Sequence, residues 1–476
     1  MVRPVREIIS SLIPYLRGGI MKRLSGRVAK VAIVVAAVFF SAGSALGAGF
    51  ALIEQGVAGL GNAYAGGAAS ADDATTIFFN PAGMTRIASQ QAVVGAHLIM
   101  PTAAFHNEGS THLLQAKTGV PLLGGDGSDA GVAKLAPNFY YVRKMGDRLA
   151  LGLGVNSPFG LATDYESSWV GRYHALESDV VTININPSVA YKVTDHLSVG
   201  GGLDIQYINA TLSNAIDFGT LDAVGAFQAL GLAPGALKLV PQAADGYVRV
   251  EGNDWSLGYN LGLLYEFNGN TRVGAAYRSS VKHTLKGDAE FQGVPSGLAP
   301  FPVFKGGGVS ADIKLPDSLS VSLTHRITPE WTVMADVTWT NWSVFNELRV
   351  KFDNPAQADS VTVTDWRDSY RYSLGVTYAP EGRWTYRAGV AYDETPIPDT
   401  QHRTPRIPDG NRFWTAAGLG YKISKLMTVD VGYAHLFIKD PVINKTPTGE
   451  DATRGGLNGT YDAYVNIASA QLTLNF

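Results

Sequence analysis

The spacing between strand-like segments is the feature that most constrains this chain. Apolar and polar residues alternate at every second position in segments such as 255–265 and 370–378, and this period is the signature of a half-exposed strand. Fourteen such segments are predicted, over residues 90–104, 136–144, 147–157, 179–193, 195–213, 246–267, 271–292, 309–327, 330–352, 361–379, 382–394, 411–423, 426–439 and 460–476. The connections between them alternate strictly between short turns and long loops. An even number of strands connected in this way is typical of an outer-membrane β-barrel.

The segment before the strands, residues 48–86, has a different character. It is crowded with Gly and Ala, shows neither strand alternation nor a helical stripe, and ends in the turn sequence Asn80-Pro81-Ala82-Gly83. Such a segment cannot build a core alone, so we expect the barrel to enclose it. The predicted fold is an all-β, 14-stranded antiparallel transmembrane β-barrel formed by residues 89–476, with residues 48–88 as a small N-terminal plug in its lumen.

The first 47 residues have the pattern of a secretory leader. Basic residues between Met21 and Lys30 precede the apolar run Val31–Phe40, and small residues lead to a predicted cut before Ala48. The apolar run covers about ten residues, whereas a bilayer-spanning helix needs roughly 20, so a cleaved signal peptide is favoured over an uncleaved anchor. Residues 1–20 precede a good start at Met21 and are interpreted as a misassigned extension. The predicted location is the outer membrane.

The composition disfavours several classes of function. The 476-residue chain contains no Cys, which excludes a disulfide framework, a Cys-ligated zinc site and Cys catalysis. Beyond residue 47 it keeps 31 basic and 40 acidic residues, and an acidic chain without a basic patch argues against a nucleic-acid partner. Metalloprotease, serine-hydrolase and nucleotide-binding motifs are absent from the sequence. We therefore expect no enzymatic activity, no cofactor and no metal.

Short motifs along the whole chain resemble those of the FadL-type family of outer-membrane transporters for long-chain fatty acids and other hydrophobic compounds. The matching fragments are Ala48-Gly49-Phe50, Gly59-Leu60-Gly61, Ala63-Tyr64, Ala71-Asp72-Asp73-Ala74, Asn80-Pro81-Ala82, Gly160-Leu161-Ala162-Thr163, Leu315-Pro316, Tyr370-Arg371, Ile407-Pro408-Asp409 and Arg412-Phe413-Trp414. Each fragment is short, but their order and spacing make the resemblance specific. It implies a passive uptake channel that binds a hydrophobic small molecule and contacts outer-membrane lipid and lipopolysaccharide. The terminal Phe476 is similar to the signal read by the outer-membrane assembly machinery, which is therefore an expected partner during biogenesis. We also expect the protein to be a monomer.

The predicted substrate-binding residues lie in two places. The long loops 223–240 and 291–304 are unusually apolar, and exposed apolar surface marks interaction sites. Their candidates are Phe227, Leu230, Phe301 and Phe304, although the two loops could instead pack on each other as a lid. The resemblance also implies that the mature N-terminus reaches a central pocket, which adds Phe50, Leu52 and Ile53. At the positions aligned with the family's carboxylate-binding basic residues this chain has Asn214 and Thr362. That departure favours a neutral ligand, or a rearranged site that uses Arg349 or Lys351.

Two further groups of residues are singled out. Strand 147–157 runs into Pro158, Phe159 and Gly160, where Pro lacks a ladder donor and Gly weakens the strand. Either the strand simply ends there, or it kinks and opens the wall, and the resemblance implies a lateral exit. Five charged residues fall opposite the lipid-facing side chains and are predicted to point inward as a lumenal ion network that holds the plug: Arg371, Arg387, Arg412, Asp336 and Asp430. The alternative functions are a structural or adhesive surface barrel and an open polar porin.

Overall fold

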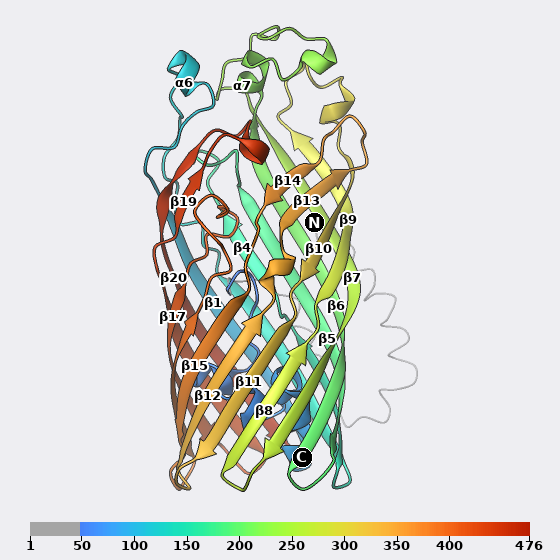
Figure 1. The fold of residues 1–476 in the computed structure, drawn as a ribbon, viewed down its shortest axis with the longest axis vertical. Helices are drawn as coiled ribbons and strands as arrows, with labels where there is room; N and C mark the ends of the chain where they lie inside the picture. Colours follow the sequence, from blue (N-terminus) through green and yellow to red (C-terminus); the bar gives the residue numbers. More distant parts are fainter. Residues whose placement is uncertain (1–47) are drawn as a thin grey trace. The chain divides into compact units, whose positions relative to one another are not determined.

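The computed structural model describes residues 48–476, and these form a closed wall of antiparallel strands around a short N-terminal segment (Figure 1). The predicted signal peptide at residues 1–47, with its extension at residues 1–20, lies outside the described residues. Within residues 48–476, none of the helices is both long and apolar enough to cross a membrane.

The wall consists of fourteen strands, six of which are interrupted and therefore carry two labels. The strands are β1 (Gln90–Asn107), β2 (Lys134–Met145), β3 (Leu149–Asn156) with β4 (Gly160–Asp164), β5 (Glu177–Lys192), β6 (Leu197–Asp217), β7 (Asp245–Glu266), β8 (Thr271–Arg278) with β9 (Val281–Gln292), β10 (Gly307–Leu315) with β11 (Ser318–Arg326), β12 (Trp331–Thr340) with β13 (Glu347–Phe352), β14 (Ser360–Val363) with β15 (Ser369–Tyr378), β16 (Trp384–Asp393), β17 (Arg412–Lys422), β18 (Met427–Ile438) with β19 (Val442–Lys445), and β20 (Leu457–Asn475). The predicted strand positions agree with these to within four residues, except that β4 and β19 continue two strands by seven and six residues beyond the predicted ends at 157 and 439.

The barrel closes because its first strand pairs with its last. β1 pairs with β2 on one side, Gln90 opposite Arg143, and with β20 on the other, Gln91 opposite Asn475. A closed sheet of this kind pairs the backbone groups that an open edge would expose, which a bilayer requires. The predicted 14-stranded antiparallel barrel is therefore confirmed.

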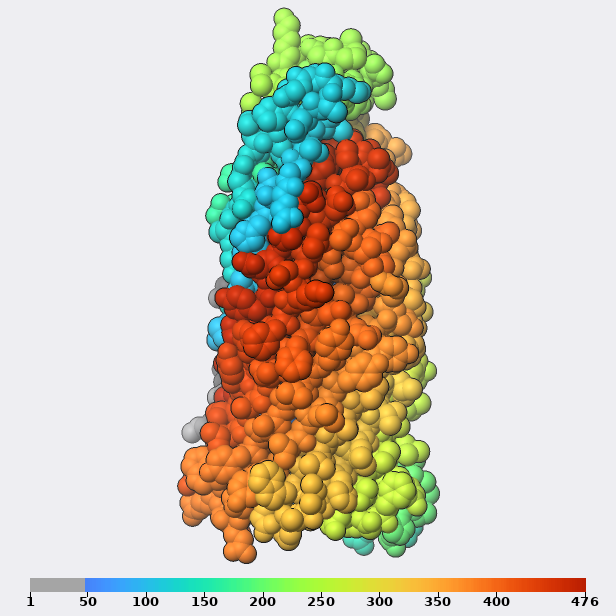
Figure 2. Space-filling view, turned by 60° about the vertical axis from the view of Figure 1, so that its left-hand side comes forward, coloured from blue at the N-terminus to red at the C-terminus, as the bar shows by residue number. Residues whose placement is uncertain are grey.

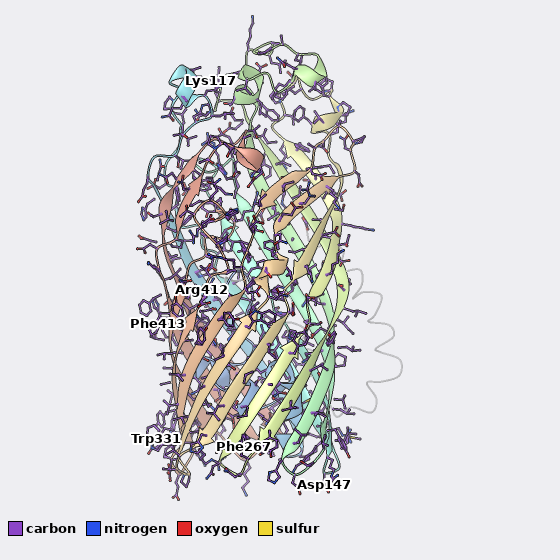
Figure 3. All side chains as sticks on the ribbon, viewed as in Figure 1. Lys117, Asp147, Phe267, Trp331, Arg412 and Phe413 are labelled. Carbon is purple, nitrogen blue, oxygen red and sulfur yellow. The ribbon has the colours of Figure 1, made fainter. Side chains whose placement is uncertain are left out.

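Alternate residues of each strand face opposite sides of the wall. On β17, Arg412 is buried in the lumen whereas its neighbour Phe413 points outward and is 46% exposed (Figure 3). Outward-facing aromatic rings gather towards the end with the short turns, where Trp331 stacks on Tyr378 with ring centroids 4.5 Å apart. Phe267 lies at the same end (Figure 3). An outward apolar band with aromatic rings at its border is the surface that a membrane barrel presents to lipid.

The plug, residues 48–88, occupies the lumen nearer the short turns (Figure 1). Its helical turns are α3 (Val57–Gly61), α4 (Gly67–Ser70), α5 (Thr76–Phe79) and η1 (Pro81–Arg86). The plug bonds directly to the wall, because Asn62 donates to the Val376 carbonyl at 2.8 Å and Arg272 donates to the Ala69 carbonyl at 3.1 Å. A Cβ added at Gly389 would overlap the Asn62 backbone, so the wall lacks a side chain where the plug touches it.

The long connections form the opposite, loop end of the barrel. They carry α6 (Gln115–Thr118), α7 (Phe218–Ala223), η2 (Gln228–Leu230), η3 (Pro302–Phe304) and η5 (Gly449–Asp451), while η4 (Trp342–Val344) lies between β12 and β13. The segments around α6 and α7 stand above the strands at this end (Figure 2).

Candidate functional site

An aromatic cluster in the lumen centres on Phe50, which is only 3% exposed. Four rings surround it, with centroids 4.8 Å away for Trp342, 5.6 Å for Phe345, 5.9 Å for Trp366 and 6.0 Å for Phe159. Tilted and edge-on contacts at these distances are favourable for aromatic rings. Phe50 therefore fills the position where the first residues of the plug meet the wall. We call these five rings the aromatic seal.

An apolar tunnel with a cavity volume of about 90 Å³ begins at the aromatic seal and runs towards the loop end. Its walls come from strands and loops far apart in the sequence: Phe50, Leu161, Val180, Leu285, Ile313, Phe345 and Ile407. Most of these side chains are buried and belong to one hydrophobic cluster with Trp342 and Trp366. The tunnel can accept a hydrocarbon chain and offers almost no polar partner to one.

An outer cavity of about 230 Å³ continues the tunnel towards the loops. The two share six lining residues: Leu212, Val250, Leu348, Val350, Thr362 and Arg406. The outer cavity adds polar groups that the tunnel lacks, among them Asn214, Tyr173 and Arg454. Together the two form one path with a polar outer end and an apolar inner end.

An inner cavity of about 150 Å³ lies on the other side of the aromatic seal. Leu52 and Ile53 line it, together with Pro158 and Phe159 from the wall. Arg371 also lines this cavity, and its Nε and Nη1 atoms have no hydrogen-bond partner among the described residues. Phe50 lines the tunnel. It also contacts Trp342 and Phe159, which line the inner cavity. Phe50 therefore separates the two.

The first residues of the plug form a strap that is hydrogen-bonded to the wall at this point. The Leu52 amide donates to the Pro158 carbonyl at 2.8 Å and the Gly160 amide donates to the Phe50 carbonyl at 2.9 Å. These bonds form a small antiparallel bridge between Ala51 and Phe159. The strap, residues 48–55, is thus paired with the inside of the wall at a single bridge.

A second anchor holds the start of the strap. The Gly49 amide donates to Asp409 Oδ2 at 2.9 Å, and Asp409 is itself bound by Arg412, whose Nε lies 3.0 Å from Oδ1. Gly49 has φ +60°, and an added Cβ would lie 2.7 Å from the Trp366 ring. Only glycine fits this backbone and this space without strain.

The wall is interrupted where the strap attaches. β3 ends at Asn156 and β4 resumes at Gly160, still paired with β5, so the simpler interpretation that the strand ends at Pro158 is wrong. On the other side, pairing with β2 stops at Phe139 opposite Val155 and a single bridge returns at Gly131 opposite Thr163. Between these two pairs the chain covers eight residues on each side, from 131 to 139 and from 155 to 163. The two segments therefore stay in register across an unpaired stretch. We call this stretch the breach.

The apolar loop residues lie together at the loop end. Phe227 is 5% exposed and packs edge-on against Phe304, with centroids 5.9 Å apart, and Leu230 and Phe301 belong to the same cluster. The two loops therefore do pack on each other, as in the lid interpretation. They remain predicted capture residues, and Leu230, Phe301 and Phe304 are more accessible than Phe227.

The inward charges are distributed over several local groups. Arg387 Nη1 lies 2.8 Å from Asp430 Oδ1, which is a direct pair within the predicted set. Arg371 donates to the Ala63 carbonyl of the plug at 2.8 Å, and Asp336 accepts hydrogen bonds from the hydroxyl groups of Ser320, Ser322 and Thr338. Arg371 thus reaches the plug directly, while Arg412 reaches the strap through Asp409. Their role in holding the plug stays a prediction.

The Asn80-Pro81-Ala82 motif anchors the plug to the wall. Asn80 is fully buried, and its amide group donates to the Ala68 carbonyl at 2.6 Å and to the Leu263 carbonyl of β7 at 2.9 Å. The side-chain Oδ1 atom of Asn80 caps η1 by accepting from the Ala82 amide at 3.0 Å, and Pro81 follows at the first helical position. One side chain therefore ties together two parts of the plug and one wall strand.

Sequence reasoning missed several residues of this path. Trp342, Phe345 and Trp366 lie in interruptions of predicted strands, and Arg406 lies in a long loop that turns into the lumen. The two cations named as possible substitutes line neither the tunnel nor the outer cavity, and both are engaged by acids. Arg349 bonds Glu347 and Asp359, and Lys351 lies 3.5 Å from Asp312.

Comparison with known proteins agrees with this architecture. Residues 38–476 match the family model described as outer membrane protein transport protein (OMPP1/FadL/TodX). The chain is 33% identical to a long-chain fatty acid transport protein of Salmonella typhi over 429 residues, covering 88% of this chain and 94% of that one. It is 30% identical to outer membrane protein P1 of Haemophilus influenzae over 462 residues, covering 93% and 98%.

A solved structure supports the same assignment. The crystal structure of a Pseudomonas aeruginosa FadL homologue is similar, with a TM-score of 0.80 and 26% identity over 90% of this chain and all of that one. The family match and the alignments with the relatives each cover most of the described residues. The chain therefore belongs to the OMPP1/FadL/TodX family of outer-membrane transport proteins.

Proposed function

We propose that this protein is a passive uptake channel for hydrophobic molecules, which it releases sideways into the membrane. The observation that carries this proposal is a broken path through the lumen: the outer cavity and apolar tunnel end at Phe50, and the inner cavity behind it reaches Pro158 and Phe159 at the breach. The relatives named long-chain fatty acid transport proteins support a hydrophobic cargo.

Transport in this scheme has three steps. The substrate first adsorbs to the accessible apolar side chains of the loop cluster, which include Leu230 and Phe301. It then enters the tunnel, where burial of a hydrocarbon chain is favoured by about 0.8 kcal/mol per CH₂ group. Withdrawal of the strap moves Phe50 out of the aromatic seal and joins the tunnel to the inner cavity. The substrate leaves through the breach, where the backbone edges are already unpaired.

The two alternative functions explain fewer features of the lumen. A structural or adhesive barrel has no use for an apolar tunnel that ends on a buried aromatic ring. An open porin needs a clear lumen, whereas the described plug bonds to wall strands on several sides.

We further propose that the mature chain begins at Ala48 after signal-peptide cleavage and acts as a monomer. Sequencing of the N-terminus of outer-membrane material tests the cleavage.

A reversible cross-link tests the mechanism. Ala51 and Phe159 form a bridge pair, and Cα atoms in such a pair lie about 4.5–5.5 Å apart, within the range for a disulfide. The double variant Ala51→Cys/Phe159→Cys introduces the only cysteines of the chain. Oxidation locks the strap to the wall, and uptake of a radiolabelled hydrophobic compound by intact cells should stop.

The same protein in its reduced form is the matched control, because it carries both substitutions and differs only in the covalent bond. Reductant should restore uptake to the reduced-form rate. Full uptake through a verified cross-link would show that the strap does not move, and the proposed route would then be wrong. Heat-dependent electrophoretic mobility checks that equal amounts of folded barrel are present.

A further inference from the structure

One ion pair crosses the breach. Pairing along β2 stops at one end of the breach and returns at the bridge between Gly131 and Thr163. Three residues from that bridge on each edge, the same register places Lys134 opposite Gly160. The backbone of β2 is unpaired on this side, yet Lys134 Nζ lies 2.6 Å from Asp179 Oδ2 of β5. A side-chain contact therefore links the two edges where the backbone contacts are missing.

The Lys134–Asp179 pair joins the lumenal face of one edge to the outer face of the other. Lys134 is paired with Ile99 of β1, which packs in the lumen against the plug, and directly opposite residues of an antiparallel ladder share a face. Asp179 precedes Val180, which lines the tunnel, so Asp179 faces the outside of the wall. Because β4 and β5 are paired at this height, the lysine reaches Asp179 through the unpaired stretch. The Lys134 side chain therefore occupies the breach.

The burial of β4 agrees with a side chain that lies over it. Ala162 stands opposite Asp179 in the ladder between β4 and β5 and shares its outer face, but Ala162 is only 2% exposed. A methyl side chain leaves room for the stem of a lysine, which can pack along apolar surface while its ammonium group stays partly wet. The side chains of Lys134 and Asp179 are 22% and 28% exposed. The breach is thus covered on its membrane side.

The pair is a single link and not part of a network. Within residues 48–476 the ammonium group of Lys134 contacts no second acid, and the carboxylate of Asp179 is bound by no second cation. The nearby Glu177 pairs with Arg249 instead, at 3.5 Å. A partly exposed ion pair without further support is weak, so it can open and close without a ligand of its own. Its loss should act at the breach alone.

We propose that Lys134 is the gating residue of the lateral exit: its side chain fills the breach while it is paired with Asp179 and swings aside when a substrate passes. This inference rests on the proposed function and names the group that closes its exit. Phe159 of the aromatic seal is followed directly by Gly160, which stands opposite Lys134. The seal thus closes the lumenal side of the opening, and Lys134 closes its membrane side against lipid.

Uptake kinetics test the gate. Lys134→Met keeps an apolar stem and removes the charge, and it is placed both in the wild type and in Phe50→Ala, where the aromatic seal no longer limits passage. At saturating substrate, uptake of a radiolabelled hydrophobic compound by intact cells should be about twofold to fivefold faster than in Phe50→Ala alone, as expected for loss of a partly exposed ion pair. Asp179→Asn should have the same effect. The two substitutions together should add nothing further, because both remove one link.

Labelling from the membrane side tests the filling of the breach without turnover. The full chain is reconstituted in phosphatidylcholine nanodiscs that contain a diazirine-bearing hydrocarbon, and mass spectrometry measures photolabelling of residues 155–163. Lys134→Ala removes the stem and should raise this labelling, and Lys134→Met should raise it less. Lys351→Met is the matched control for both experiments, since it removes a lysine that pairs with Asp312 at 3.5 Å on other strands. It should leave uptake and labelling at the level of its parent.

Two results would overturn the gate and leave the uptake proposal intact. One is a rate in Lys134→Met that stays at or below that of its parent in both backgrounds, at equal levels of folded barrel. The other is unchanged labelling of residues 155–163 in Lys134→Ala, because this side chain would then not fill the breach. Wild-type cells that take up no more substrate than cells lacking the protein would instead refute the uptake proposal itself.

Discussion

Phe50→Ala tests whether Phe50 limits passage as a seal or serves only as a structural core residue. The ring is 3% exposed and contacts four other aromatic rings, so its truncation should weaken the seating of the strap by about 3–5 kcal/mol. The backbone bonds of Leu52 and Gly160 and the Gly49–Asp409 bond all survive this change. The loss is therefore local, and the barrel should remain assembled.

The expected consequence is faster transport. If seal opening limits passage, 3 kcal/mol raises the open population by roughly a hundredfold, until another step becomes limiting. We expect the initial rate of uptake of a radiolabelled hydrophobic compound by intact cells to rise by about tenfold or more at equal levels of folded protein. The measurement is made at saturating substrate, where every channel is occupied and the rate reports opening of the seal and not the amount of bound substrate.

Phe105→Ala provides the matched control. Phe105 is 2% exposed and packs on Trp169 and Tyr461, so its truncation costs a similar energy away from the tunnel and the inner cavity. This variant should show uptake equal to or below the wild-type rate. If Phe50→Ala is no faster than the wild type, or falls in step with Phe105→Ala, then Phe50 does not limit passage and the reasoning fails.

Three further outcomes are expected. Asn80→Ala leaves the Leu263 carbonyl without its partner, at a cost of about 1–3 kcal/mol, so limited proteolysis should cleave the plug faster while the heat-dependent mobility of the barrel stays unchanged. Gly389→Val places a side chain against Asn62 and should expel the plug, which single-channel recordings would detect as a larger ionic conductance. Burial raises the pKa of Glu54 to about 7, so the folded strap binds a proton that the released strap loses above about 4.5. Strap seating should therefore weaken as pH rises from about 5 to about 8, seen as faster hydrogen exchange at 48–55, and Glu54→Gln should remove this dependence; exchange that slows with rising pH, after correction for the intrinsic rate, would contradict it.

The strands were predictable because their signal is local. Along 370–378 every second side chain faces lipid, and a window of nine residues contains that pattern whatever surrounds it. The interruption between β10 and β11 has a local signal in Pro316, although the sequence pattern predicts a single strand over 309–327. The break between β8 and β9 has no such signal, because it depends on Ser279, whose hydroxyl group accepts from the Tyr259 amide of the neighbouring strand at 2.9 Å. Contacts between strands of this kind leave no periodic trace in the sequence.

The candidate site was predictable only where the chain resembles its family. Phe50, Pro158 and Phe159 were identified in this way, and they do meet at the aromatic seal and the breach. Trp342 and Arg406 could not be found from sequence, because both lie in irregular segments that fold back into the lumen. A charged residue in a long external loop looks solvated until the structure shows that the loop has entered the barrel.

The seal and the breach are joined by the same two hydrogen bonds, and this links their opening. The Phe50 carbonyl is held by the Gly160 amide, and the Leu52 amide is held by the Pro158 carbonyl, so the strap cannot withdraw Phe50 while both bonds remain. Each bond is worth about 1 kcal/mol net, so breaking the pair is a small cost beside the burial of the aromatic ring. Once they break, Phe159 loses its partner on the strap and faces a wall edge that was never paired with β2. In the proposed mechanism, a substrate that displaces Phe50 therefore frees the exit by the same movement, and neither the seal nor the wall needs a separate trigger.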